Sequence, residues 1–135
     1  MKDKKKIKVI CGLIFNHEKK LLITRRKKPP YFHKWEFPGG KIEKGESEID
    51  CLKREINEEL NIEININSFF TQNEYAYPRF VVHLVSYLCS YKKGVLKLVD
   101  HDACVWIDIN SLCNYEFLQA DKHILKKLNQ EKMNF

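Results

Sequence analysis

The sequence predicts an α/β fold, an α/β/α sandwich in which a mixed β-sheet lies between helices. Three observations predict this fold. Strand-forming segments recur along most of the chain, one amphipathic helix interrupts them near the middle, and a second helix closes the chain. The length of 135 residues and the hydrophobic share of 44% are those of one globular domain with its own core. We expect a single domain over residues 1–135, with residues 1–6 as a flexible basic tail.

The first third of the chain predicts strands. Residues 7–15 and 21–25 are rich in strand-forming residues, and the polar turn 16–20 between them predicts a β-hairpin. Residues 35–37 form a short strand, which the sequence Pro-Gly-Gly at 38–40 ends.

A helix is predicted between Ser47 and Asn61. Ser is a favoured N-cap, and Asn is second to Gly in the left-handed conformation that ends helices. Apolar residues between them recur at helical spacing and form one buried stripe, made of Ile49, Leu52, Ile56 and Leu60.

The second half of the chain returns to strands. Strands are predicted over residues 62–70, 80–91, 95–99 and 103–109, and the segment 72–77 places Tyr75 and Tyr77 on one face. Residues 110–115 form a short helical turn. A final helix begins at Asp121 as its N-cap and buries Ile124, Leu125 and Leu128.

Three carboxylates lie together on the central helix. Glu55, Glu58 and Glu59 stand at positions i, i+3 and i+4, so their side chains are neighbours. They occupy the last turns of the helix, where the macrodipole disfavours acids. Arg54 can pair with Glu58, but one Arg leaves excess negative charge. A hard cation such as Mg²⁺ would neutralise it, so we interpret the cluster as a catalytic metal site. The alternative is a solvated acidic face paired with Lys53 and Arg54.

The residues around this cluster resemble the Nudix box. Gly40, Glu46, Arg54–Glu55 and Glu58–Glu59 stand at the spacing of that motif, and Asn61 stands where the family usually has Gly. Asn tolerates the same backbone conformation. The resemblance extends over most of the chain, through LLITRR, WEFPGGKIEKGE, the Tyr-Pro-Arg turn and LQAD, and is closest to the MutT branch.

The resemblance implies the Nudix α/β/α sandwich and a Mg²⁺-dependent enzyme, with Mn²⁺ as a possible substitute. In the MutT branch, water attacks the β-phosphorus of a nucleoside triphosphate such as 8-oxo-dGTP and releases a monophosphate and pyrophosphate, which sanitises the nucleotide pool. The implied metal ligands are Gly39 (through its carbonyl), Glu55, Glu58 and Glu59. A further acid, Asp100 or alternatively Asp102, or a box Glu, is the implied general base. Arg54 and Glu46 are expected to brace the carboxylates.

The resemblance also implies substrate-binding residues. Arg25 or Arg26, at a strand end, would clamp phosphate, and we favour Arg25. The expected base pocket consists of Trp35, Phe37, Arg79 and Asp121. Asp121 stands where the MutT type has an Asn that reads guanine. An ionised Asp accepts but does not donate hydrogen bonds, so an exocyclic amine of cytosine or adenine is an alternative target. Asp121 could equally be only a helix cap.

Other functions have weaker support in the sequence. CTP or 5-hydroxy-CTP hydrolysis is the first alternative, and Pro78 falls near a marker proline of ADP-ribose hydrolases. A binding module that has lost catalysis is least expected, because all the box glutamates are present.

Charge and cysteine content limit the partners. Of the net charge of +6, residues 1–8 supply +4, from five Lys and one Asp, so nucleic acid is not required. The five cysteines include no CxxC pair, which favours reduced cysteines in the cytoplasm. The sequence contains no apolar run of membrane-spanning length. The expected partner is a nucleoside triphosphate, bound by a monomer or weak dimer.

Overall fold

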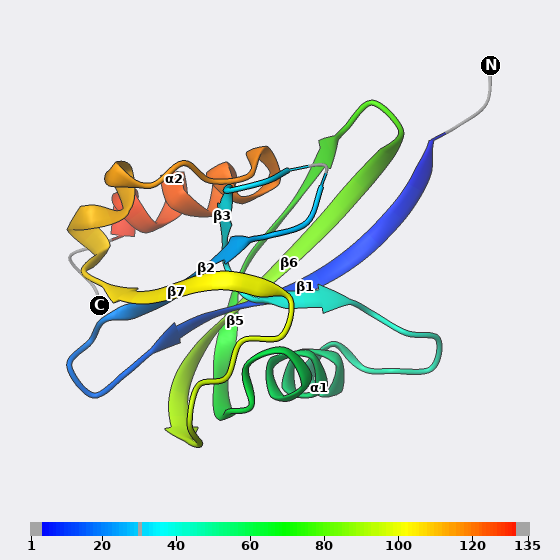
Figure 1. Cartoon of the computed structure of the whole chain (residues 1–135). Helices are drawn as coiled ribbons and strands as arrows, with labels where there is room; N and C mark the ends of the chain where they lie inside the picture. The colour runs from blue at the N-terminus through cyan, green and yellow to red at the C-terminus, as the bar shows by residue number, and fades with distance from the viewer. Residues whose placement is uncertain (1–3, 30, 132–135) are drawn as a thin grey trace.

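One mixed sheet carries a helix on each face in a computed structural model, which describes residues 4–29 and 31–131 (Figure 1). Its strands are β1 Lys5–Phe15, β2 Leu21–Arg26, β3 Trp35–Glu36, β4 Gly39–Lys41, β5 Glu63–Ala76, β6 Phe80–Lys93 and β7 His101–Ile107. Its helices are α1 Glu48–Leu60 and α2 Lys122–Glu131, with the 3-10 helices η1 Ile109–Asn114 and η2 Gln119–Asp121. The predicted α/β/α sandwich is confirmed.

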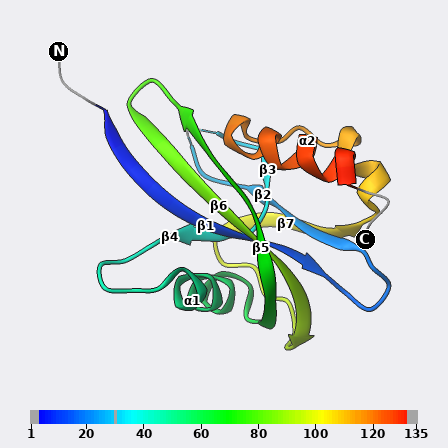
Figure 2. The ribbon, with the colours of Figure 1, turned by 180° about the vertical axis from the view of Figure 1, so that it is seen from behind.

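The sheet is mixed because its central pair, β1 and β6, is parallel, whereas β2, β3, β5 and β7 join in antiparallel pairs. The hydrogen-bonded order is β3-β2-β1-β6-β5, with β4 paired to β1 and β7 paired to β2. From behind, the long β5–β6 pair crosses the molecule beside β1 (Figure 2). The pairing of β4 with β1 brings the segment before α1 against the centre of the sheet.

Helix α1 has the predicted caps. The Ser47 hydroxyl accepts a hydrogen bond from the Asp50 amide at 3.0 Å. Asn61 has φ 60° and ψ 31°, and its amide donates to the Asn57 carbonyl, which ends the helix in the left-handed conformation. The predicted stripe is buried except for Ile49, which is 37% exposed.

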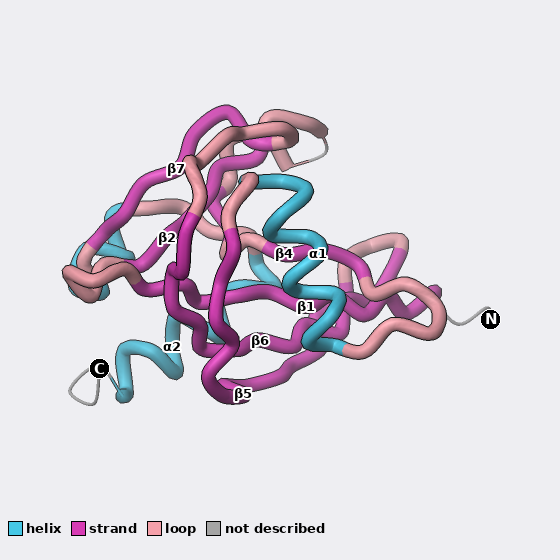
Figure 3. Tube along the Cα trace, turned by 90° about the horizontal axis from the view of Figure 1, so that it is seen from below, coloured by secondary structure: helices cyan, strands magenta, loops and turns pink. Residues whose placement is uncertain are grey.

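Each face of the sheet has its own core. One cluster packs under α1 and includes Ile10, Ile14, Leu22, Leu52 and Ile56. The other packs under α2 and includes Leu13, Leu21, Ile23, Ile124 and Leu128. Successive residues of β1 and β2 divide between the two clusters, as strand alternation requires. Figure 3 shows α1 lying across the sheet when the molecule is seen from below. Neither helix in the described part of the chain has the length and apolarity to cross a membrane.

Several element boundaries differ from the prediction. Strand β1 begins at Lys5, so the predicted tail over residues 1–6 extends too far, and residues 1–3 lie outside the described residues. The segments predicted over residues 62–70 and 72–77 form one strand, β5. Its pairing with β6 contains bulges, and the strand continues through them. The strand predicted over residues 95–99 is wrong, because these residues form a loop with Val95 80% exposed.

The sequence analysis did not predict β4. Gly39 explains why a Pro-Gly-Gly segment can pair with β1. A Cβ atom at Gly39 would lie 2.0 Å from the carbonyl oxygen of Ile10, so any other residue would separate the two strands.

Candidate active site

The site forms where β4 crosses α1. A Cβ atom at Gly40 would lie 2.2 Å from the carboxyl carbon of Glu55, so only glycine lets the β4 backbone approach this carboxyl group. The Gly40 carbonyl lies 3.7 Å from the Cys51 sulfur, one turn earlier on α1. The glycines therefore place backbone oxygens and an α1 carboxylate at one point of the fold.

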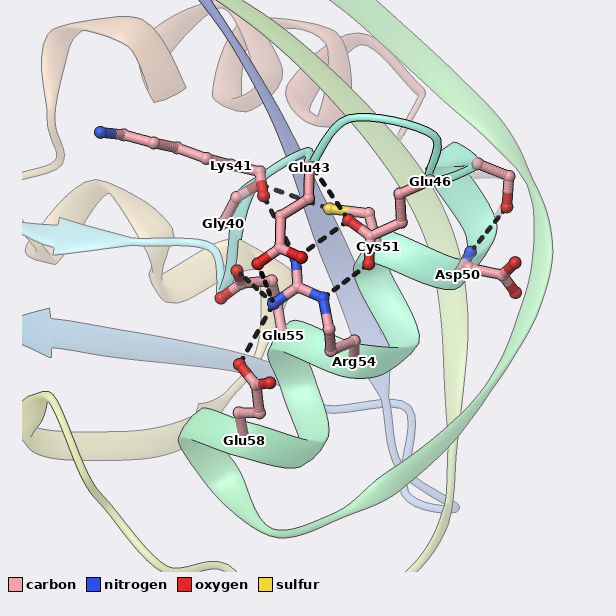
Figure 4. A network of polar contacts seen from close by, with 10 residues as sticks. Gly40, Lys41, Glu43, Glu46, Asp50, Cys51, Arg54, Glu55 and Glu58 are labelled. Atoms are coloured by element: carbon pink, nitrogen blue, oxygen red, sulfur yellow. Dashed lines mark hydrogen bonds and ion pairs between the residues drawn. The ribbon is translucent and has the colours of Figure 1, made fainter.

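Arg54 connects the carboxylates of this region (Figure 4). Its guanidinium donates to both oxygens of Glu46, at 2.6 and 3.0 Å. It also donates to Glu55 at 2.9 Å, to Glu58 at 3.1 Å and to the Lys41 carbonyl at 3.3 Å. The hydrogen bonds from Arg54 to Glu46, together with that from the Glu43 amide, lower the pKa of Glu46 to about 2. Arg54 thus fixes the loop before α1 to the helix and holds Glu55 in place.

Glu55 and Glu59 are the α1 carboxylates that face the cavity beside β4. Burial raises the pKa of Glu59 to about 8, and the charges of Glu55, Glu36 and Asp100 add to this rise. The Oε2 atom of Glu59 is buried and has no hydrogen-bond partner among the described residues. Burial also raises the pKa of Glu55, against the opposing hydrogen bond from Arg54.

Glu58 lies apart from these two. Its side chain is 59% exposed, is paired with Arg54 and does not line the cavity. In the described part of the chain, no three Asp, Glu, His or Cys side chains already converge as a metal cluster. Glu58 instead shares the Arg54 guanidinium with Glu55, at 3.1 and 2.9 Å.

The donor set nevertheless fits a hard divalent cation. Oxygen donors from Glu55 and Glu59 lie together in the cavity wall, and the unpaired Oε2 of Glu59 is a buried acceptor for which the protein supplies no donor. Mg²⁺ and Mn²⁺ prefer such oxygen ligands.

The cavity has a volume of about 710 Å³ and two chemically distinct walls. The acidic wall consists of Glu36, Glu55, Glu59 and Asp100. The apolar wall includes Tyr31, Phe37, Tyr77, Phe80, Val82 and Leu84. A cavity with this combination suits a ligand that presents a cation, such as a metal ion bound to phosphate, at one end and a flat apolar group at the other.

Comparison with known proteins gives the family. A family model described as the NUDIX domain matches residues 5–128. The chain belongs to the Nudix family.

Two relatives of this Nudix chain at about the same identity carry the names of different activities. It is 31% identical over 127 residues to an 8-oxo-dGTP diphosphatase of Escherichia coli K12, covering 93% of this chain and 98% of that protein. It is 30% identical over 122 residues to a CTP pyrophosphohydrolase of the same organism, covering 90% of each. The protein is therefore a Nudix hydrolase of the MutT-like branch.

Solved structures agree with this fold. A MutT protein from methicillin-resistant Staphylococcus aureus 252 is 32% identical, with a TM-score of 0.76 over 98% of this chain and all of that one (100%). A MutT protein from Methanosarcina mazei Go1 has a TM-score of 0.86 over 98% and 99% of the two chains, and at 22% identity it supports the fold alone.

Arg25 and Arg26 of the Nudix hydrolase point to opposite faces of β2. Arg25 donates to Asp102 at 2.7 Å, lies 5.7 Å from the Trp35 ring centre and is absent from the cavity lining. Arg26 lines the cavity and donates to Glu36 at 3.2 Å. Of these two arginines, Arg26 is the one that lines the cavity, and Arg25 is not. Strand alternation groups Arg26 with Leu22, but the sequence does not say which face α1 covers.

Two residues expected in the base pocket lie elsewhere. Trp35 contacts Tyr115 edge to face, with ring centres 5.0 Å apart, on the α2 side of the sheet. Arg79 is exposed in the turn between β5 and β6. The other two expected residues, Phe37 and Asp121, do line the cavity.

Asp121 is the last residue of η2 and directly precedes α2, and its buried side chain accepts from the Phe37 amide through Oδ2 at 2.9 Å. Burial and the charge of Glu36 raise its pKa well above the usual value. The raised pKa of Asp121 favours the neutral form of its carboxyl group. A neutral carboxyl group both donates and accepts.

The two aspartates proposed as the general base, Asp100 and Asp102, also lie in different places relative to the cavity. Asp100 lines the cavity and pairs with Lys28 at 3.2 Å. Asp102 is held by Arg25 outside the cavity lining, and this ion pair lowers its pKa. The cavity thus contains Asp100, and its catalytic role remains a prediction.

Sequence analysis missed Glu36 and His101. His101 is 5% exposed, and its Nε2 lies 2.9 Å from Oε2 of Glu36. The available signal was an acidic residue between two aromatic residues in the short strand over residues 35–37. The predicted strand over residues 103–109 excluded His101, and nothing in the sequence joins it to Glu36.

A second cavity, of about 760 Å³, lies between η1, residues 115–117 and α2. Among its lining residues Glu116 is the one carboxylate. It therefore lacks the oxygen cluster on which phosphate chemistry depends.

Proposed function

We propose that this Nudix hydrolase is a Mg²⁺-dependent nucleoside triphosphate pyrophosphohydrolase that converts 8-oxo-dGTP into the monophosphate and pyrophosphate. One observation carries the proposal. A single cavity joins the Glu55 and Glu59 carboxylates to an apolar wall beside Asp121. The 31% identity to an 8-oxo-dGTP diphosphatase over almost the whole length of both proteins supports it.

The acidic wall would serve the phosphate end. Mg²⁺, or Mn²⁺, held by Glu55, Glu58, Glu59 and the Gly39 carbonyl would neutralise phosphate charge and lower the pKa of the attacking water. Arg54 keeps Glu55 in position, and Arg26 and Lys28 add positive charge in the cavity. The Asp100 carboxylate would accept the proton of the attacking water. Asp100 lines the cavity outside α1, and its ion pair with Lys28 holds it there.

The apolar wall would serve the base. Phe37 and Tyr77 offer aromatic surface, and a neutral Asp121 offers an O–H donor together with an acceptor oxygen. This combination resembles the donor and acceptor pair of an amide. A neutral Asp121 could therefore pair with an acceptor and a donor of a guanine edge, whereas an ionised Asp121 would accept only from N–H groups.

CTP-type hydrolysis is the second candidate. The observation that favours it is an acidic residue at position 121 together with the 30% identity to a CTP pyrophosphohydrolase. An ionised Asp121 would accept from the exocyclic amine of cytosine. The protonation state of Asp121 with substrate bound is thus the physical difference between the two candidates.

The test is pyrophosphate release in the presence of Mg²⁺ from 8-oxo-dGTP, dGTP, CTP, dCTP, 5-hydroxy-CTP and ADP-ribose. A kcat/KM that is highest for 8-oxo-dGTP supports the first proposal, and one highest for the cytosine nucleotides supports the second. Preference for ADP-ribose would refute both. We also propose that the enzyme acts in the cytoplasm as a monomer or weak dimer and needs no nucleic acid.

A further inference from the structure

Three neighbouring strands bring Glu36, Arg26 and His101 together. Glu36 lies on β3 and His101 on β7, and both strands pair with β2. Arg26 is the β2 partner of His101, directly after a bulge between Arg25 and Arg26. Bulges turn side chains to a new direction and occur often beside active sites. All three residues line the cavity of the proposed active site.

Each carboxylate oxygen of Glu36 has its own donor. Arg26 donates to Oε1 at 3.2 Å, and the ring Nε2 of His101 lies 2.9 Å from Oε2. A carboxylate accepts, so we assign the proton between them to Nε2 of His101. His101 is almost fully buried and cannot easily move. Glu36 is therefore held in one orientation, although it stands at the wall of an open cavity.

Glu36 belongs to the acidic wall and interacts electrostatically with carboxyl groups at both ends of this cavity. Its charge contributes to the raised pKa of Glu59 at the acidic wall and to that of Asp121 beside the apolar wall. The next residue, Phe37, donates its amide to Asp121. The peptide unit that joins Glu36 to Phe37 therefore also links Glu36 to the carboxyl group of Asp121.

We propose that His101 is a positioning residue for substrate selection, which holds the Glu36 carboxylate ready to accept an N–H or O–H of the nucleoside. The inference rests on the proposed function, because it assumes that the cavity binds a nucleotide. His101 itself would not touch the reacting phosphorus. Its loss should therefore weaken nucleoside binding and leave the chemical step almost unchanged.

Two variants separate this role from simple packing. His101→Gln carries an amide nitrogen close to the position of Nε2 and can still donate to Glu36. His101→Asn carries its amide closer to the backbone, at the position of Nδ1, and cannot reach Glu36. Both replace the ring by a polar side chain of lower volume, so loss of packing alone affects both.

The experiment measures kcat and KM of the wild type and both variants on the nucleotide panel, with thermal unfolding as the folding control. We expect His101→Asn to raise KM about tenfold, the effect of one lost hydrogen bond to a charged group, with kcat almost unchanged. His101→Gln should restore most of the affinity. Comparing CTP with dCTP shows whether a sugar hydroxyl or the base supplies the donor. Equal KM values for the two variants, or a loss confined to kcat, would overturn the inference.

A second measurement does not depend on turnover. Calorimetric titration in EDTA compares the binding of the corresponding nucleoside monophosphates to the wild type and His101→Asn. Weaker binding to His101→Asn supports the inference even if the wild type hydrolyses none of the triphosphates, a result that would refute only the proposed function. Equal binding overturns the inference. Should His101→Asn fail to fold, Glu36→Gln takes its place in both measurements, because it keeps the shape of the acceptor and removes its charge.

Discussion

Replacing Glu59 by Gln should stabilise the metal-free protein while abolishing its activity. Glu59 has a buried carboxyl oxygen with no partner, and burial raises its pKa from 4.5 to about 8. A carboxyl group whose pKa is raised on folding favours the protonated folded state. The folded protein therefore loses stability as the pH rises from about 4.5 to about 8, and it regains this stability at lower pH.

The size of the effect follows from the same pKa. At 1.36 kcal/mol per pKa unit, the rise corresponds to at most about 5 kcal/mol above pH 8. Solvent reaches part of Glu59 and screens its charge, so we expect on the order of 1–2 kcal/mol. A neutral amide of the same shape removes this cost. For a domain of this size the midpoint of thermal unfolding should rise by roughly 3–8 °C.

The assay is thermal unfolding in EDTA at about pH 9 and about pH 5, for the wild type, Glu59→Gln and the control Glu18→Gln, which changes an exposed glutamate in the turn between β1 and β2. Glu59→Gln should exceed the wild type at the higher pH, and the two should converge at the lower pH. Adding Mg²⁺ should stabilise the wild type alone. If Glu59→Gln is less stable than the wild type at about pH 9 in EDTA, the carboxylate has a structural partner and the reasoning is refuted.

Three further predictions test the cavity. Glu58→Gln should lower pyrophosphate release by orders of magnitude with an unchanged unfolding midpoint, because it removes a ligand charge from an exposed side chain, and near-normal turnover would exclude Glu58 as a ligand. Lys28→Ala should raise KM for triphosphates several-fold and weaken the dependence of KM on salt. The control Lys27→Ala changes a neighbouring lysine outside the cavity lining and should do neither. Equal KM values for the two variants would contradict a phosphate contact by Lys28. Gly40→Ala should displace Glu55, cost about 1–3 kcal/mol of stability in urea unfolding and abolish turnover, and an active, stable variant would disprove the tight approach of β4 to α1.

Local sequence determined α1 and its position. Capping residues, helical spacing and the left-handed Asn61 act within a few residues of one another, and the structure reproduces them. The i, i+4 spacing likewise brings Glu55 and Glu59 to the cavity, whereas Glu58 is paired with Arg54 outside the cavity lining. The family and the sandwich fold followed from these local patterns and their order along the chain.

The structure alone decided which residues share the cavity. The sequence could not say whether α1 covers the Arg25 or the Arg26 face of β2, since alternation defines two faces but not which helix packs on each. It could not join Glu36 to His101, which are 65 positions apart and meet only because β3 and β7 pair with the same strand. Nor could it show that Asp121 is buried, because burial is set by elements that fold over a residue from elsewhere in the chain, and burial is what changes the chemistry of its carboxyl group.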